Sequence, residues 1–416
     1  MGFNARSDDS RGMPVYPLDG AHVDAFERIR ISEPITLFDG LNQYNDSPLF
    51  FETTLTGGGT STHLPNESSV RLSVTTASGD KVIRQSREYF RYTPGKSQLI
   101  LMSNVMGAPK ANTRQRLGYF DASNGLFFEN NGSTFGVVQR SKVSGSVVDT
   151  RVAQSAFNID KLDGTGLSRI NIDLSKANVF VMDFEWLGVG RVRMGVFDQV
   201  GRIQYCHEFV HVNTNTTAYS TTACLPLRWE LENTGTAASE TDLRVICCSV
   251  ITEDGAFLDQ TTGLKFSASN GTTTKSVTSR VAVLSIEPKA TFNSIENRGK
   301  IANLSFEIYT QDNPVFYEII YGGTLGGTPS FNSVDGSSIV EYDTAGTTVT
   351  GGIVIDSGYV PSGDKLPPSV ITRSALSKLP LVLDSTGANP IKLTVVVTSL
   401  NLTAVVGAAL HWTEVY

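Results

Sequence analysis

The chain has 416 residues, of which 40% are hydrophobic and 18% are charged, and its formal net charge at pH 7 is −7. The length suggests two or three domains at roughly 100–200 residues each, and the hydrophobic fraction excludes a disordered chain. The acidic balance disfavours a general nucleic-acid binder, and since no run of about 18 apolar residues exists, we expect a soluble chain with no membrane span.

The first residues form a polar segment that contains Pro14, Pro17 and Pro34 but no pattern of a core element. We therefore expect residues 1–35 to form an extended arm, which becomes ordered only by lying against another surface. The segment also lacks the apolar stretch of a secretory signal peptide.

The rest of the chain shows period-2 alternation and short β-branched runs, bounded by Gly, Asn, Asp, Ser or Pro. This pattern is typical of strands joined by turns, and it predicts an all-β fold of β-sandwiches or jelly rolls. The clearest strand patterns are Val70–Thr75, Gln98–Met102, Asn178–Trp186, Arg191–Phe197, Arg244–Ile251, Lys392–Thr398 and Gly407–Val415.

Two turn signals predict β-hairpins. The first is Asn130–Gly132, between LFFE and TFGVV, where Asn-Gly supplies the positive φ that a tight turn needs. The second is Ser78–Asp80, between VRLSVTT and KVIRQS. In each case we expect the two flanking strands to pair with one another.

Composition divides the strand-rich part of the chain into two domains. We expect residues 36–261 to form one large β-sandwich domain and residues 280–416 to form a second. Between them, residues 262–279 are rich in Ser, Thr and Gly and are interpreted as a linker. A strand pattern at Ala408–Tyr416 runs to the last residue, which suggests pairing within its domain or with a neighbouring subunit.

The segment His207–His211 reads HEFVH, the HExxH pattern of zinc peptidases. That chemistry needs a helix, which places both histidines on one face with the glutamate as general base. Residues 201–212 alternate as a strand instead. Residues four apart on a strand are about 13 Å apart, whereas Zn–N bonds are about 2.0–2.1 Å. We expect two histidines on a strand face and no metal site, with a zinc hydrolase as the alternative.

Asp183 and Glu185 lie two residues apart on one face of a predicted strand. Paired carboxylates on a β-sandwich resemble laminarinase-like glycosidases, whose strand carries ExDxxE, but this sequence has no further carboxylate in that register. Two carboxyl groups about 5–5.5 Å apart could act as a retaining pair. We expect a solvated or salt-bridged strand face, with glycan cleavage as the alternative.

Aromatic and basic residues offer further candidate contacts. Trp186, Trp229 and Trp412 would stack on sugars if exposed, although strand aromatics more commonly pack in a core. The segment Arg84–Tyr92 (RQSREYFRY) is expected to be a strand with an exposed charged face rather than a nucleic-acid contact.

The remaining motif searches are negative. The four cysteines lack CxxC spacing and are too few for a disulfide scaffold, so we expect thiols and, for the neighbours Cys247 and Cys248, burial. No phosphate-binding loop, GxSxG motif or dinucleotide fingerprint occurs. We therefore assign no catalytic, cofactor-binding or metal-binding residue and expect no enzyme and no cofactor.

A set of stretches stands out between residues 24 and 235: Asp24–Asp39 (DAFERIRISEPITLFD), Asn66–Thr76 (NESSVRLSVTT), Tyr92–Leu101 (YTPGKSQLIL), Lys110–Phe120 (KANTRQRLGYF), Asn124–Glu129 (NGLFFE), Asp183–Arg193 (DFEWLGVGRVR) and Leu225–Asn233 (LPLRWELEN). This set resembles a family of virion structural proteins encoded by tailed bacteriophages. Asn313–Glu318 (NPVFYE) and Ser399–Trp412 resemble it more weakly. The motifs are structural, so no active-site residue is carried over.

The resemblance implies a non-enzymatic protein of a tailed-phage virion, assembled in the host cytoplasm and placed in the tail, baseplate or fibre, or on the head as a decoration. The implied partners are copies of the chain in a homo-oligomer, such as a trimer, and other tail or capsid proteins. No membrane or specific nucleic-acid partner is expected. The alternative is a tail component that binds or cleaves host-surface glycans.

Overall fold

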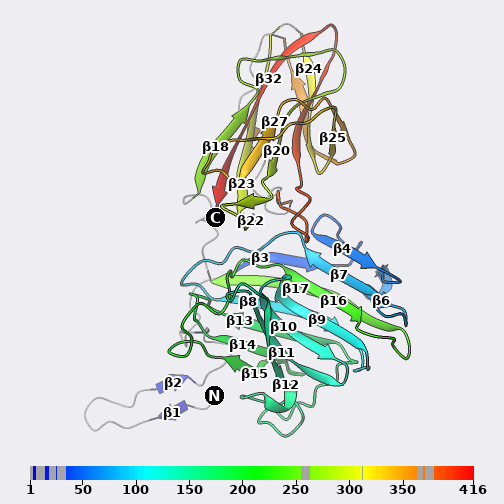
Figure 1. Cartoon of the computed structure of the whole chain (residues 1–416), viewed down its shortest axis with the longest axis vertical. Coiled ribbons are helices and arrows are strands. Elements are labelled where there is room, and N and C mark those ends of the chain that lie inside the picture. Colours follow the sequence, from blue (N-terminus) through cyan, green and yellow to red (C-terminus); the bar gives the residue numbers. More distant parts are fainter. Residues whose placement is uncertain are drawn as a thin grey trace, which may run out of the picture. The chain divides into compact units, whose positions relative to one another are not determined.

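The computed structural model describes residues 34–253, 263–311, 313–362 and 379–416, together with the short stretches 3–5, 15–17, 25 and 369–370. These residues are all-β, as the alternating pattern predicts, and their helical content is two 3₁₀ turns, η1 (Pro65–Glu67) and η2 (Gln154–Ala156). No helix in these ranges is long and apolar enough to cross a membrane. The chain divides into two compact units, Met1–Ala256 and Phe257–Tyr416 (Figure 1).

The first unit contains two antiparallel sheets. The seven-stranded sheet has the order β12–β11–β10–β9–β16–β7–β4. Its strands are β12 (Val148–Ala153), β11 (Thr134–Ser141), β10 (Gly125–Asn131), β9 (Thr113–Phe120), β16 (Leu227–Asn233), β7 (Lys81–Ser86) and β4 (Phe51–Thr56).

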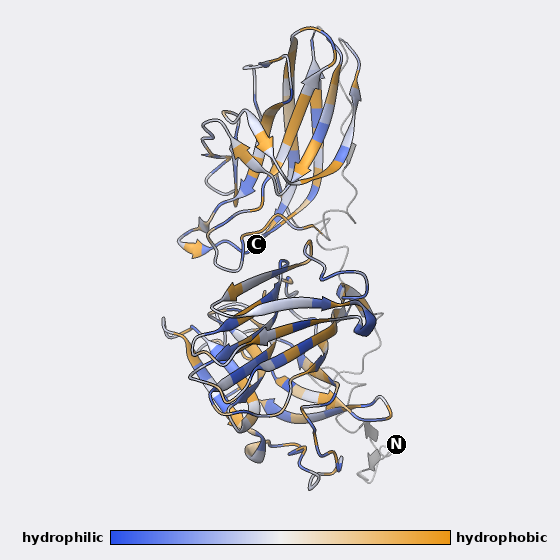
Figure 2. Ribbon diagram, turned by 90° about the vertical axis from the view of Figure 1, so that its right-hand side faces the viewer, coloured by the Kyte–Doolittle hydropathy of each residue, from blue (hydrophilic) through white to orange (hydrophobic). Residues whose placement is uncertain are grey.

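The eight-stranded sheet of this unit has the order β15–β14–β13–β8–β17–β6–β5, with β3 also paired to β17. Its strands are β15 (Ile203–Phe209), β14 (Val192–Phe197), β13 (Asn178–Phe184), β8 (Gln98–Val105), β17 (Thr241–Glu253), β6 (Ser69–Val74), β5 (Thr60–Leu64) and β3 (Pro34–Leu41). Figure 2 shows the hydrophobic and hydrophilic segments that alternate along many strands of both units.

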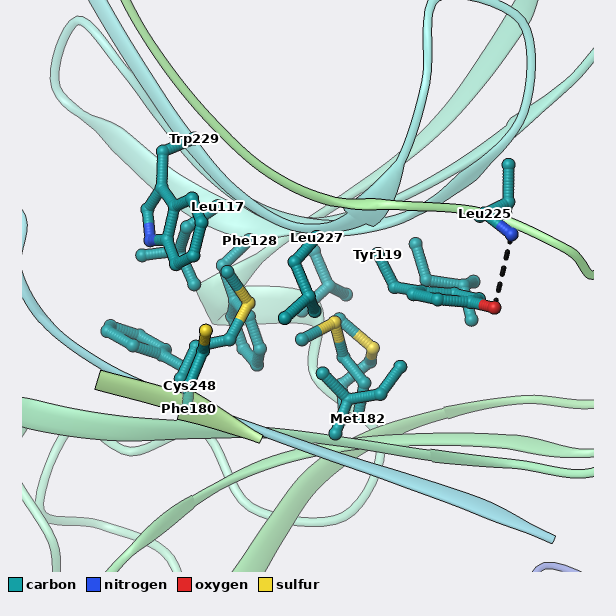
Figure 3. Close-up of a cluster of buried hydrophobic side chains, with 14 of the residues drawn as sticks. Leu117, Tyr119, Phe128, Phe180, Met182, Leu225, Leu227, Trp229 and Cys248 are labelled. Atoms are coloured by element: carbon teal, nitrogen blue, oxygen red, sulfur yellow. Dashed lines mark hydrogen bonds between the residues drawn. The ribbon is translucent and has the colours of Figure 1, made fainter. Parts of the chain in front are cut away.

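One hydrophobic core lies between the two sheets, because alternate residues of each strand point inward. Trp229 of β16 faces Phe180 of β13 and Cys248 of β17 across this core (Figure 3). Tyr119 is fully buried, and its hydroxyl accepts a hydrogen bond from the Leu225 N–H at 3.1 Å. Burial of such apolar surface, at about 25 cal/mol per Å², holds the two sheets together.

The second unit also packs two main sheets around its own core. The five-stranded sheet has the order β18–β32–β23–β30, with β19 paired to β32, and the six-stranded sheet has the order β26–β27–β20–β31–β24–β29. The first comprises β18 (Leu264–Ser269), β32 (Ala404–Val415), β23 (Lys300–Thr310), β30 (Ser369–Val370) and β19 (Lys275–Val277). The second comprises β26 (Asn332–Ser333), β27 (Val340–Asp343), β20 (Val281–Pro288), β31 (Leu393–Ser399), β24 (Val315–Tyr321) and β29 (Ile353–Val360).

Two small ladders complete this unit. They pair β21 (Thr291–Phe292) with β22 (Ile295–Glu296), and β25 (Thr324–Gly326) with β28 (Thr348–Thr350).

The hairpin predicted at Asn130–Gly132 is confirmed. Strands β10 and β11 pair antiparallel, and Asn131 lies opposite Thr134. The two loop residues are therefore Gly132 and Ser133, one position later than the Asn-Gly signal suggests. Gly132 adopts the positive φ, 63°, that this turn requires.

The hairpin predicted at Ser78–Asp80 is wrong, because the flanking strands β6 and β7 belong to different sheets. The turn carries the chain across the core instead of folding it back into the same sheet. It is held by the end of β16, where the Gly79 N–H donates to the Asn233 carbonyl and the Asn233 N–H donates to the Asp80 carbonyl, each at 2.9 Å. The turn residues were recognisable in the sequence, but their partner lies about 150 residues away in the chain.

The linker predicted at residues 262–279 is also wrong, since β18 and β19 lie within it and both pair with β32. Most side chains of β18 are exposed or half-buried, so its Ser-rich composition reflects a sheet edge rather than a lack of structure. The second unit therefore begins well before Arg280. The pairing of β18 and β23 with β32 also confirms that the C-terminal strand pairs within its own domain.

The predicted arm ends earlier than residue 35. Strand β3 begins at Pro34 and pairs with Glu253 of β17, so Pro34 and Ile35 belong to the sheet. Within the arm, β1 (Phe3–Ala5) and β2 (Val15–Pro17) pair antiparallel. The rest of the predicted arm lies outside the described residues, apart from Ala25.

Candidate functional site

The two histidines of HEFVH lie in different surroundings. His207 is in β15, a strand as predicted, whereas β15 ends at Phe209 and His211 lies beyond it. The ring nitrogens of His211 are each 2.7 Å from an acceptor, Nδ1 from the Gly190 carbonyl and Nε2 from Gln139 Oε1. Burial lowers the pKa of both imidazoles. In the described ranges no three His, Cys, Asp or Glu side chains gather as metal ligands.

Asp183 is fully buried in an ion pair, on the face of β13 that points away from the core. Its Oδ2 accepts hydrogen bonds from Arg193 and from the Tyr205 hydroxyl, both at 2.6 Å. Its Oδ1 accepts a hydrogen bond from Ser97 Oγ at 3.1 Å. Glu185 is 2% exposed. The face is therefore salt-bridged and not solvated, and neither carboxylate is open to a substrate.

The outer face of β13 and β14 is covered, since Asp183 and Arg193 both have no exposed surface. Ala25, from the N-terminal region, contributes to this contact. It is buried, and its carbonyl accepts a hydrogen bond from Arg191 Nε at 2.8 Å. At this residue the N-terminal region contacts the β-sandwich of its own unit.

None of the three tryptophans is exposed. Trp229 and Trp412 are buried in the cores of the two units, which confirms the expectation of core packing. Trp186 is half-buried and packs edge-on against Tyr92, with ring centroids 6.0 Å apart.

The segment Arg84–Tyr92 does not form the exposed charged face that the sequence suggests. Arg84 is 1% exposed, and its guanidinium donates to Asn42 Oδ1 at 3.0 Å and to the Asp46 carbonyl at 2.5 Å. Burial lowers the pKa of Arg84 to about 10. The basic group is thus part of the packing between β7 and the loop after β3.

The four cysteines are thiols, without a disulfide. Cys206 and Cys248 are buried, and burial raises the pKa of both thiols. Cys247 is only half-buried, so the expectation of two buried neighbours is correct for Cys248 alone. Adjacent strand residues point to opposite faces, and only one of those faces is the core.

The sequence reasoning missed an ion-pair network on the outer face of the seven-stranded sheet. Arg116 lies at its centre, with Nε 2.7 Å from Glu129 and a second nitrogen 3.1 Å from Glu230. Arg228 contacts the other oxygen of Glu230 at 2.5 Å, and Arg151 contacts the other oxygen of Glu129 at 2.9 Å. All four carboxylate oxygens are therefore engaged.

This network favours the charged form of Glu230. Burial alone would raise the pKa of Glu230, but Arg228, Lys81 and Arg116 outweigh it and lower the pKa to about 2. A carboxylate with that pKa is a poor general acid near neutral pH. The signal in the sequence was the spacing of charged residues two apart in TRQR and RWELE, because residues two apart lie on one face of a strand. The strand register then places the glutamates of RWELE opposite the arginines of TRQR.

A second unpredicted cluster lies in the six-stranded sheet. Glu287 of β20 is directly opposite Glu341 of β27, and Lys392 Nζ is 2.5 Å from the Glu287 carboxylate. Burial raises the pKa of Glu287 to about 7, against the opposing effect of Lys392, and the neighbouring Glu341 adds to the rise.

We expect Glu287→Gln to stabilise the protein above pH 7 by about 1–3 kcal/mol. A carboxyl group whose pKa is raised on folding contributes its stability below about pH 4.5, and that contribution is lost as the pH rises through 7. Urea unfolding at pH 5 and pH 8.5 measures the difference. Glu318→Gln, in a surface pair with Arg280, is the control, and an equal gain at both pH values would contradict the prediction.

A hollow of about 560 Å³ lies at one open edge of the first unit. It is bounded by β11 and the loop that follows, by β12, and by the segment after β15. Its lining residues are Gln139, Ser141, Val143, Ser144, Val148, Thr150, Phe209, Val210, His211, Asn215, Thr217, Ala218 and Tyr219. Of the segment HEFVH, the last three residues, Phe209, Val210 and His211, lie in this lining.

No family model matches this chain, and no curated protein matches its sequence. Among solved structures it is similar to an endo-β-1,4-glucuronan lyase from the fungus Trichoderma reesei, at 11% identity over 52% of this chain and 95% of that one, with a TM-score of 0.35. A β-glucanase of Bacillus licheniformis is also similar, at 11% identity over 52% of this chain and 97% of that one, with a TM-score of 0.32. So is a legume lectin-like domain from Entamoeba histolytica, at 10% identity over 52% of this chain and 97% of that one, with a TM-score of 0.29. These similarities concern β architecture alone, and no function is transferred from them.

Proposed function

We propose that this chain is a non-enzymatic structural protein of a tailed-phage virion, as its sequence resemblance implies, and that it acts by assembling with copies of itself and with neighbouring tail or capsid proteins. The observation that supports a structural role is that buried ionisable groups are engaged within the chain. Asp183, Glu129 and Glu230 are buried in ion pairs, and both nitrogens of His211 have hydrogen-bonding partners.

The architecture supports the same proposal. Each unit closes its own core between two sheets, and buried ion pairs cross-link neighbouring strands on outer faces that would otherwise be solvated. Removing one partner of such a buried ion pair is strongly destabilising, so these pairs favour one register between neighbouring strands. A particle component that must keep its shape benefits from such a fixed register.

The N-terminal arm is the segment that we expect to mediate assembly. Deleting residues 2–33, so that β3 still begins at Pro34, is expected to leave a folded chain that no longer enters particles. Immunoblotting of purified particles from cells that express only the deleted chain measures incorporation, and circular dichroism checks folding. Replacement of the same residues by a Gly/Ser segment of equal length controls for chain length. Normal incorporation of the deleted chain would refute the role of the arm.

A second candidate function is glycan binding on the host surface. The observation that favours it is the hollow beside His211, which is lined by hydroxyl, amide, aliphatic and aromatic side chains and by no Asp, Glu, Lys or Arg. Cleavage by Asp183 and Glu185 is not proposed, because both carboxylates are buried.

A further inference from the structure

We propose that the hollow beside His211 is a binding site for an uncharged, hydroxyl-rich ligand, and that neutral oligosaccharides are the ligand class that fits it. The site lies at the edge of the sandwich, between the end strand of one sheet and the chain that leaves the end strand of the other. This inference rests on the second candidate function, glycan binding, for which it names the site and the ligand class, and it does not depend on the assembly role.

The chemistry of the lining carries the argument. None of the lining residues is Asp, Glu, Lys or Arg. The polar groups are hydroxyls and amides, supplied by Ser141, Ser144, Thr150, Asn215 and Thr217 together with Gln139. Such groups both donate and accept hydrogen bonds, as sugar hydroxyls do, and they offer a charged ligand no counter-ion.

The register of the end strands explains how these groups come together. Thr150 lies directly opposite Gln139 across the β11–β12 ladder, so the two side chains point to the same side of the sheet. Val152, on that side too, packs against the core, and Val148 continues the row outward with 51% of its surface exposed. On this face of β12, the side chains therefore run from the core at Val152, through Thr150, to the hollow at Val148.

The base of the hollow is held by ring stacking and hydrogen bonds. The His211 ring stacks on Tyr219 with centroids 4.1 Å apart, and its two nitrogens contact Gly190 and Gln139. Both His211 and Tyr219 are buried. Burial lowers the pKa of His211, against the hydrogen bond to the Gly190 carbonyl, and so disfavours a positive charge at the base. A pre-formed base reduces the entropy lost when a ligand is ordered.

The walls and the size of the hollow also suit a saccharide. Val148 and Val210 are about half exposed and offer apolar surface to the C–H faces of a sugar ring. Among the described strands β12 pairs only with β11, so the backbone groups of its other edge can bond to a ligand. The volume of about 560 Å³ lies in the range of about 300–1,000 Å³ typical of small-ligand sites.

The test is saturation-transfer NMR and calorimetric titration of the full chain. The neutral probes are maltotriose, lactose and N,N′-diacetylchitobiose, and the charged probe is 6′-sialyllactose. We expect saturable binding of at least one neutral probe, with a Kd on the order of 1 mM, and weaker binding of the charged one. Thr150→Arg should weaken binding at least tenfold, because it places a long cation in the hollow. Thr134→Arg, at an exposed position of β11 outside the lining, is the matched control.

Three outcomes would overturn this inference: no neutral probe binds, the charged probe binds most tightly, or Thr150→Arg binds like the control. Incorporation of Thr150→Arg into particles, measured in parallel, separates this inference from the assembly role. Loss of binding with normal incorporation supports a site that is distinct from the assembly surface. Loss of incorporation by this variant but not by Thr134→Arg would show that the hollow is an assembly contact, and it would refute the ligand site.

Discussion

Replacing Asp183 by Ala is expected to lower the free energy of unfolding of the first unit by about 3–5 kcal/mol. The substitution removes the carboxylate that accepts from Arg193, Tyr205 and Ser97, and it leaves a guanidinium with no exposed surface beside a cavity. The midpoint of urea unfolding should fall while the slope with denaturant stays unchanged.

Two further variants sharpen this experiment. Asp183→Asn keeps the shape and part of the hydrogen bonding, so it should cost less than Asp183→Ala. Glu67→Ala removes a pair with Arg244 in which both side chains are more than 40% exposed, and it should cost at most about 1 kcal/mol. If Asp183→Asn with Glu185→Gln left stability unchanged but abolished a measured glycan-cleaving activity, the structural role assigned to Asp183 would be wrong.

Glu230→Gln is expected to remove part of the acid sensitivity of the first unit, the part that comes from the carboxylate of Glu230. The pKa of Glu230 is lowered to about 2 in the folded protein, from an ordinary value of 4.5, because Arg228, Lys81 and Arg116 outweigh its burial. The carboxylate therefore contributes stability above pH 4.5, and this contribution is lost as the pH falls through 2. A shift of this size corresponds to about 3 kcal/mol.

The measurement is the free energy of unfolding from pH 7 to pH 2, by urea titration at each pH. The Glu230→Gln variant should be about 3 kcal/mol less stable than the unchanged protein at pH 7, and the two curves should converge near pH 2. Glu67→Gln, in an exposed ion pair, should follow the unchanged protein throughout. Parallel curves for Glu230→Gln and the unchanged protein would show that its ion pairs do not lower its pKa.

Much of the local structure could be predicted because it depends on neighbours in the sequence. The seven strongest strand patterns all fall on strands, for example Asn178–Trp186 on β13 and Gly407–Val415 on β32. Alternation of side chains along a strand is a local property, so the sequence displays it directly. The hairpin at Gly132 was found for the same reason, since its turn residues and its two strands are contiguous.

The errors occur where a strand's partner is distant in the sequence. The turn at Ser78–Asp80 has hairpin residues, yet it crosses to the opposite sheet because its hydrogen bonds are made with Asn233. The Ser-rich stretch after residue 262 was interpreted as a linker, although β32, about 140 residues later, takes it into a sheet. A polar composition indicates that a segment is exposed, and an exposed edge strand therefore has the same composition as a linker.

The candidate site shows the same division. The sequence predicted strand histidines rather than a zinc site at His207 and His211, because strand spacing separates residues four apart, and it placed Asp183 and Glu185 on one predicted strand. It did not reveal that Asp183 is neutralised by Arg193, or that Arg116 joins Glu129 to Glu230, since those pairs form between neighbouring strands. Nor did it reveal the hollow, whose side chains come from residues 139 to 219.

The sequence by itself determined that this protein is all-β, that its strands alternate between a core face and an outer face, and that HEFVH lies on or beside a strand and not on a helix. Those properties follow from side-chain order within a few residues. Only the tertiary structure decided which strands share a sheet, which charges neutralise each other and where an uncharged hollow opens. These properties depend on pairs of residues that lie about 10 to 200 positions apart in the chain. Such pairs form only when the strands of both sheets pack together around the hydrophobic core.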